Sequence, residues 1–125
     1  MPTSKEIAKI KKKAEDIEEK IISYRRKIHQ NPELSFQEKE TAALAASEMR
    51  KLGFEVRENI FGTGVTATFR NSSDPEAKTL LIRADMDALP VEEKNELSFK
   101  SQKPGIMHAC GHDGHTAILI GTAAV

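Results

Sequence analysis

A nine-residue segment, from Met107 to His115, holds most of the metal-binding side chains of this chain. It reads MHACGHDGH and contains the only cysteine and three of the four histidines among the 125 residues. Thiolate, imidazole and carboxylate are the groups that hold Zn²⁺ and neighbouring transition metals in proteins. Residues two apart share a face in an extended or turning backbone, so Cys110 and His112 can point at the same ion. The segment therefore predicts a metal site with Cys110 and His112 as ligands.

The other groups of this segment leave more than one interpretation open. His108, Asp113 and His115 could be further ligands or supporting residues, and the sequence does not assign their roles. The non-metal alternative is a buried structural cysteine beside a histidine that caps the following helix. A lone Cys-x-His pair would favour that alternative, but a His/Cys/Asp cluster is typical of ligand sets. Two ligands remain incomplete, because a catalytic metal requires at least three protein groups.

A different chemistry would make Cys110 a nucleophile, with His112 or His108 as its base. A helix that begins within a few residues would favour the thiolate form. The sequence offers no evident oxyanion hole and no third residue to orient the base. A cysteine enzyme is therefore kept as an alternative to the metal site.

Two carboxylates, Asp85 and Asp87, follow the apolar run at 80–82. In α/β folds, ligands bind in the crevice at the carboxyl ends of strands. A carboxylate there can hold a metal-ligating histidine by a hydrogen bond that fixes its tautomer and ring angle. The alternative is that both residues organise the turn before Pro90. The His/Cys segment that follows favours a role in the site, with Asp87 as the candidate catalytic residue.

Two amphipathic helices are expected before this region. The apolar spacing of 3 and 4 residues predicts a long helix over about Lys5–Gln30, capped by Ser4, that docks on its own domain. A coiled-coil seam is the alternative for that stripe. A second helix is predicted over about Phe36–Leu52, with a capping box formed by Ser35 and Glu38.

Strands and a third helix complete the expected α/β framework. Short strands are predicted at 54–57 and 65–69, and the clearest strand at Thr79–Ala84. The consecutive apolar residues of Thr79–Ala84 indicate a strand that is covered on both faces. Asp113 is expected to cap a helix that begins near Gly114. That helix is apolar nearly all round, which predicts burial.

Polar residues between these elements are expected to have local structural roles. His29 lies at the end of the first predicted helix, where an imidazole can interact with the last carbonyls and the helix dipole. Glu33 and Glu38 are expected to form local hydrogen bonds. Residues 91–105 are predicted to form a polar, irregular excursion.

Composition narrows the class of protein. The chain is 38% hydrophobic and 30% charged with a net charge of zero, which indicates a globular protein and argues against nucleic acid as a partner. No apolar run is long enough for a membrane span or a signal peptide. A single cysteine cannot form an internal disulfide, which fits a reducing cytoplasm. The last residue, Val125, falls inside the third predicted helix, so we expect 1–125 to be the N-terminal part of a longer catalytic domain.

Three motifs occur in the order RRKIHQNPELSFQE, LLIRADMDALPVEE and GIMHACGHDGH. Together they resemble the M20 metallopeptidases, in the branch of N-acyl-amino-acid amidohydrolases and carboxypeptidases that includes hippurate-hydrolase-like and aminoacylase-like enzymes. The resemblance runs from about Ile21 to Val125. It implies a zinc-peptidase-like α/β catalytic domain with a mixed central sheet, truncated here. It also implies a lid domain, absent from this chain, that often mediates homo-oligomer formation.

The resemblance also implies a chemistry. In the family, a pair of divalent metals, Zn²⁺ or Mn²⁺/Co²⁺, activates a water that attacks the amide carbonyl of an N-acyl amino acid or short peptide. Cys110 and His112 match ligand positions, and Asp87 matches the acidic residue that orients a ligand. Asp113 and His115 match motif positions whose role would be supporting a ligand or capping a helix. The glutamate pair that supplies the base and the remaining histidine ligands would lie beyond Val125.

The isolated chain is therefore expected to have little or no activity, although its parent would be a metal-dependent amidohydrolase or carboxypeptidase. The alternative from another class is a non-catalytic fragment that associates with a partner chain. The abrupt end at Val125 and the sheet edges that it would expose motivate this alternative.

Overall fold

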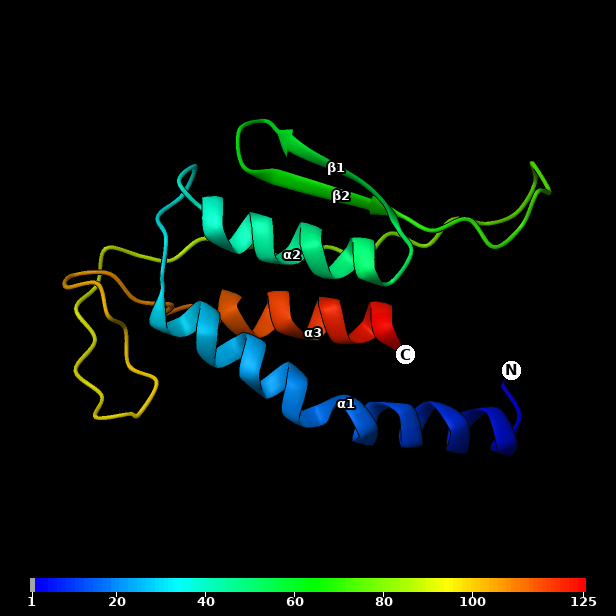
Figure 1. Ribbon diagram of the computed structural model, residues 1–125, viewed down its shortest axis with the longest axis horizontal. Coiled ribbons are helices and arrows are strands. Elements are labelled where there is room, and N and C mark those ends of the chain that lie inside the picture. Colours follow the sequence, from blue (N-terminus) through cyan, green and yellow to red (C-terminus); the bar gives the residue numbers. More distant parts are fainter. Residues whose placement is uncertain (1) are drawn as a thin grey trace.

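Three helices and one hairpin form stacked layers in the computed structural model, which describes residues 2–125. The bounds are α1 Ser4–Gln30, α2 Lys39–Lys51, β1 Glu55–Ile60, β2 Gly64–Thr68 and α3 His112–Ala124. The order across the stack is α1, α3, α2 and then the β1–β2 hairpin (Figure 1). None of the helices within 2–125 combines the length and the apolar character that a membrane crossing requires.

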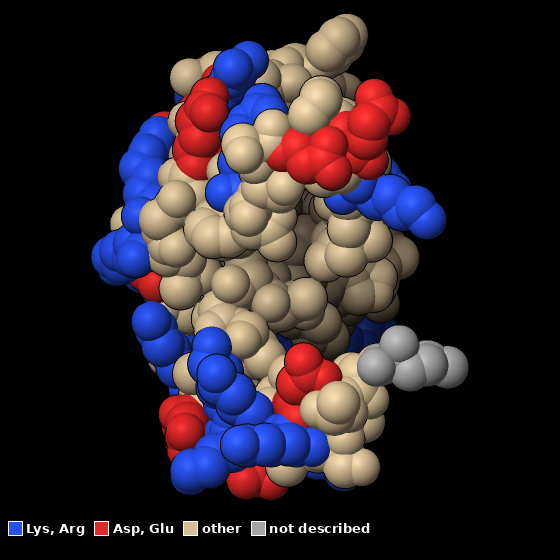
Figure 2. Space-filling view, turned by 90° about the vertical axis from the view of Figure 1, so that its right-hand side faces the viewer, with Lys and Arg blue, Asp and Glu red and all other residues tan. Residues whose placement is uncertain are grey.

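The first helix has the predicted span, but its cap lies one residue earlier than predicted. Thr3, not Ser4, is the N-cap: its hydroxyl accepts from the Glu6 N–H at 3.3 Å, and the Glu6 carboxylate accepts from the Thr3 N–H at 2.6 Å. The C-terminal half of α1 packs closely on α3, where a Cβ added at Gly121 would lie 3.1 Å from Ile21 Cδ1. The N-terminal half extends past the other helices (Figure 1). Figure 2 shows Lys and Arg gathered over that half, below a largely uncharged area.

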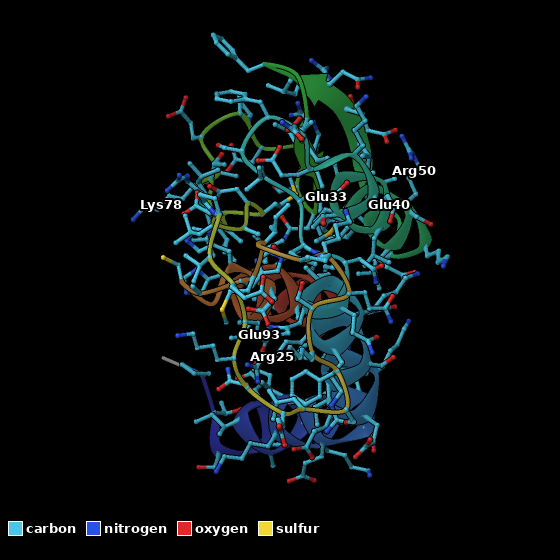
Figure 3. All side chains as sticks on the ribbon, turned by 90° about the vertical axis from the view of Figure 1, so that its left-hand side faces the viewer. Arg25, Glu33, Glu40, Arg50, Lys78 and Glu93 are labelled. Atoms are coloured by element: carbon cyan, nitrogen blue, oxygen red, sulfur yellow. The ribbon has the colours of Figure 1, made fainter. Side chains whose placement is uncertain are left out.

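The second helix begins later than predicted and uses a different cap. The capping box predicted at Ser35 does not form, and Phe36 has a φ of 64°, which is incompatible with helix at that point. The buried carboxylate of Glu33 caps the helix instead. It accepts from the N–H of Glu40 at 3.0 Å and from the N–H and hydroxyl of Thr41, both at 2.9 Å. Figure 3 shows Glu33 and Glu40 together at the start of α2.

The hairpin and the helices meet in a small apolar core. Gly53, with a φ of 87°, ends the α2 region in the left-handed conformation that is common for a glycine just after a helix. The two predicted short strands are present as β1 and β2, which pair antiparallel with Val56 opposite Ala67. Side chains from α2 and α3 form the buried centre of the core between them, and these are Ala45, Met49 and Ile120.

The strand predicted at Thr79–Ala84 does not form among the described residues, and this prediction is wrong for them. Leu80 and Leu81 are 83% and 87% exposed, in a stretch without strand pairing. A strand of this kind requires neighbours at both edges and cover on both faces. The sheet within residues 2–125 has two strands, both in the hairpin. The mixed central sheet implied by the resemblance is therefore not present in this part of the chain, whereas the α/β class is confirmed.

The third helix begins two residues before the predicted start. Gly111, with a φ of 76°, is its N-cap, and Asp113 lies in the first turn rather than at the cap. The prediction of burial nearly all round is wrong on one side, because Ile118 is 63% exposed. The opposite side packs on α1 and α2 and carries the buried Ile120.

Candidate metal centre

Backbone contacts bring together the three segments that carry the sequence motifs. The Ala88 N–H donates to the Glu33 carbonyl at 2.7 Å, beside a parallel bridge between Leu34 and Ala88. Leu89 and Met107 exchange two backbone hydrogen bonds of 3.0 and 3.1 Å. The residues around Ala88 therefore lie between the turn that follows α1 and the start of the His/Cys segment.

Asp87 and His112 form the best-defined pair of the centre. Nδ1 of His112 lies 2.9 Å from Oδ1 of Asp87 and 3.0 Å from the Asp87 carbonyl oxygen. Both oxygens are acceptors, so the pair favours the tautomer with the proton on Nδ1. The lone pair of the imidazole is then on Nε2, the nitrogen that remains available to a metal ion.

Cys110 lies two residues before His112 and is exposed, with a free thiol. Gly111 between them adopts a left-handed φ of 76°, a conformation that glycine reaches without steric cost. Sulfur and imidazole nitrogen together form a donor set that fits Zn²⁺ or a similar divalent ion. Across residues 2–125, no three His, Cys, Asp or Glu side chains are grouped so as to hold a metal. Cys110 and His112 would therefore be a partial ligand set.

The two other histidines of the segment have opposite environments. His108 is buried, and neither of its ring nitrogens has a hydrogen-bond partner in the described part of the chain. Burial lowers the pKa of the His108 imidazole, which favours its neutral form at neutral pH. His115 is exposed, and its ring centroid lies 5.5 Å from that of His112. Of these two histidines, His115 is therefore the one that is exposed to solvent beside His112.

Asp113 faces away from solvent, toward α1. Its Oδ2 lies 2.9 Å from Nδ1 of His29 and 3.2 Å from Nε of Arg25. Burial alone would raise the pKa of the Asp113 carboxyl, but hydrogen bonds from His29 and from the Gly114 backbone outweigh it, and the pKa is lowered. The other carboxylate oxygen, Oδ1, is buried with no partner in residues 2–125. Asp113 thus joins α3 to α1. The sequence predicted only a capping role for it.

Sequence reasoning missed the link between His29 and Glu93. The expected contact of His29 with helix carbonyls is wrong, because Nε2 of His29 lies 3.1 Å from Oε1 of the buried Glu93. Hydrogen bonds from Ser101, His29 and Asn95 outweigh the effect of burial, which would raise the pKa of Glu93, and leave it lowered. The partners of His29 lie 64 and 84 residues away in sequence, so no local pattern could have found them. Figure 3 labels Glu93 and Arg25, which approach this buried cluster from different segments.

Asp85 contributes through its backbone. Its carbonyl oxygen accepts from the Thr116 hydroxyl at 3.0 Å, which ties the segment before Asp87 to α3. The Asp85 side chain forms an ion pair with the exposed guanidinium of Arg83. Of the two carboxylates that the sequence placed near the site, only the Asp87 side chain contacts His112 in the described residues.

The cysteine-enzyme alternative gains no support from the geometry. No hydrogen bond joins the Cys110 thiol to His108 or His112 in the described residues, since His108 has no partner and His112 uses Nδ1 for Asp87. A nucleophilic cysteine requires a base within hydrogen-bond reach. The geometry therefore supplies no base for a Cys110 nucleophile among the described residues.

The chain is similar in sequence to peptidases and amidohydrolases. Residues 81–125 match the profile of the peptidase family M20/M25/M40. The chain is 50% identical over 118 residues to thermostable carboxypeptidase 2 of Saccharolobus solfataricus, covering 94% of this chain and 30% of that protein. It is 43% identical over 116 residues to the N-acyl-L-amino acid amidohydrolase of Geobacillus stearothermophilus, covering 93% of this chain and 31% of that protein.

A solved structure agrees with these sequence matches. The YXEP protein of Bacillus subtilis, a dinuclear metal binding peptidase from the M20 family, superposes with a TM-score of 0.81 at 41% identity. The match covers 88% of this chain and 31% of that protein. The chain thus spans about 30% of the length of the relatives that it matches.

Proposed function

We propose that this chain is part of an M20 peptidase, the family that its motifs resemble and whose profile matches residues 81–125. The full-length protein would hydrolyse amide bonds of N-acyl amino acids or short peptides with the help of divalent metal ions. The support comes from relatives named as a carboxypeptidase and an N-acyl-L-amino acid amidohydrolase, and from a neighbour described as a dinuclear metal binding peptidase. Because the chain spans about 30% of those relatives, the activity is proposed for the full-length protein.

The observation that carries the proposal is the hydrogen bond of 2.9 Å between Asp87 and His112, two residues from Cys110. In this arrangement Asp87 acts as a positioning residue: it fixes the His112 tautomer and makes Nε2 a better electron donor. The Cys110 thiolate and His112 Nε2 would hold one ion between them, and residues outside this chain would complete its coordination.

A pair of divalent ions would supply the Lewis acidity that polarises an amide carbonyl and activates water. The soft thiolate of Cys110 favours Zn²⁺ or Co²⁺, and Mn²⁺ stays a candidate for the second position. The single exposed cysteine is compatible with the reducing cytoplasm that we propose as the location. A homo-oligomer, formed through a lid domain as the resemblance implies, is part of the same proposal.

Hydrolysis of a panel of N-acyl amino acids tests this function. We expect the full-length protein, stripped of metal by a chelator, to be inactive and to recover turnover when Zn²⁺, Mn²⁺ or Co²⁺ is added. The isolated 125-residue chain should have little or no activity under the same conditions. Metal-independent turnover by the full-length protein, or robust turnover by the isolated chain, would contradict the proposal.

A further inference from the structure

The most unusual buried group outside the candidate ligands is His29, at the end of α1. Its side chain is buried and both of its ring nitrogens face carboxylates. Nδ1 lies 2.9 Å from Oδ2 of Asp113, and Nε2 lies 3.1 Å from Oε1 of Glu93. The three groups come from α1, α3 and the 91–105 segment, so this contact joins three separate parts of the chain.

The protons available to His29 restrict its charge. A neutral imidazole carries one N–H, and an ionised carboxylate can only accept hydrogen bonds. Glu93 also accepts from the Ser101 N–H at 2.7 Å, and Asp113 also accepts from Arg25 at 3.2 Å, so both side chains already act as acceptors. Two carboxylate acceptors on one ring require both ring nitrogens to be protonated. This arrangement fits an imidazolium better than a neutral ring, because a neutral ring would leave one ionised carboxylate facing an unprotonated nitrogen.

Further contacts hold the 91–105 segment around His29 and the end of α1. The Phe99 ring meets the His29 ring edge-on, with centroids 5.6 Å apart. The Arg26 guanidinium carbon lies over the same Phe99 ring, 5.2 Å from its centre. The Gln102 N–H donates to the Gln30 carbonyl at 2.9 Å. The other titratable ring near His29 is that of His108, with centroids 6.3 Å apart.

We propose that His29 is a positioning residue of the metal centre: a buried imidazolium that fixes the first turn of α3 against the 91–105 segment. Asp113, which it binds, directly follows the candidate ligand His112. Loss of the cation would leave Glu93 without a charged partner and Asp113 with Arg25 alone, and would release the turn that aims His112. This inference rests on the proposed function, because its consequence is measured at the candidate ligands.

Nitrogen NMR of the unmodified full-length protein tests the charge state directly and needs no variant. We expect both ring nitrogens of His29 to carry protons at neutral pH, with two slowly exchanging N–H signals. One unprotonated ring nitrogen would overturn the inference. This result does not depend on whether metal binds.

Metal affinity tests the positioning role, with Co²⁺ as the probe and three variants of the full-length protein. We expect His29→Gln to weaken Co²⁺ binding about 10- to 100-fold, the range typical of residues that hold a ligand in place. Adding Glu93→Gln to His29→Gln removes one of the two buried anions and should recover most of that loss. The control Tyr24→Phe removes a hydrogen bond from α1 to Glu48 of α2 and should leave Co²⁺ affinity nearly unchanged.

These outcomes separate the inference from the proposed function. Unchanged Co²⁺ affinity in His29→Gln, or a double variant that binds more weakly than the single one, would overturn the positioning role alone. Failure of the unmodified protein to bind Co²⁺ would overturn the proposed metal centre and with it the positioning role. The NMR result would still decide the charge of His29.

Discussion

Asp87 acts on His112 through two oxygens, one from its side chain and one from its backbone, both within 3.0 Å of Nδ1. The backbone contact would survive a change of side chain, whereas the charge would not. A carboxylate raises the basicity of the imidazole that it holds, and a neutral amide does so less. A substitution that removes the charge of Asp87 therefore tests whether this residue positions His112.

Asp87→Asn should weaken Co²⁺ binding to the full-length protein about 10- to 100-fold, because the imidazole loses its ionised partner. Titration followed by visible absorption measures the change. Asp74→Asn is the matched control, since Asp74 lies in an exposed loop and accepts from the Glu76 N–H at 2.9 Å. Equal affinities of the two variants would show that Asp87 does not position the ligand.

At the scale of elements, sequence patterns predicted helices well where the cause is local. The 3-and-4 spacing of apolar residues predicts α1, which spans Ser4–Gln30. The predicted start of α2 was wrong because the residue that caps the helix, Glu33, lies outside the local capping pattern. Its side chain reaches the helix across a turn. Tertiary contacts of this kind cannot be found from spacing within one element.

Glu33→Gln should destabilise the chain by about 1–3 kcal/mol, because a buried acceptor of three hydrogen bonds loses its charge and part of its acceptor capacity. Urea unfolding measures the free energy. Ser35→Ala, which removes the cap that the sequence predicted, should change the free energy of unfolding by less than about 0.5 kcal/mol. A larger loss in Ser35→Ala than in Glu33→Gln would show that Glu33 is not the cap.

At the scale of the whole molecule, the main failure of prediction is also the most informative. The Thr79–Ala84 run has the composition of a central strand, yet Leu80 and Leu81 are exposed. A strand of this type is stable only when neighbouring strands and covering helices are present. By contrast, residue types and spacing were enough to single out Asp87, Cys110 and His112 as candidates, and the structure brings Asp87 and His112 together at 2.9 Å.

Exposed apolar residues at 80–82 should make the isolated 125-residue chain self-associate, since contiguous exposed apolar surface drives association with other chains. Sedimentation at several concentrations would show mass that rises with concentration. Leu81→Lys should reduce this association, and Lys11→Gln on the exposed face of α1 is the control that should not. A monomer at every concentration would contradict this expectation.

The proposed metal centre depends most on one bond, from the Cys110 sulfur to a divalent metal. Replacing the native metal of the full-length protein with Co²⁺ tests that bond through the absorption band of thiolate-to-cobalt charge transfer. We expect the band in the unmodified protein and its loss in Cys110→Ser, with retention in Thr122→Ala, whose hydroxyl bonds only the Ile118 carbonyl of its own helix. A cobalt-loaded protein without the band, or a band that survives in Cys110→Ser, would contradict the assignment of Cys110 as a ligand.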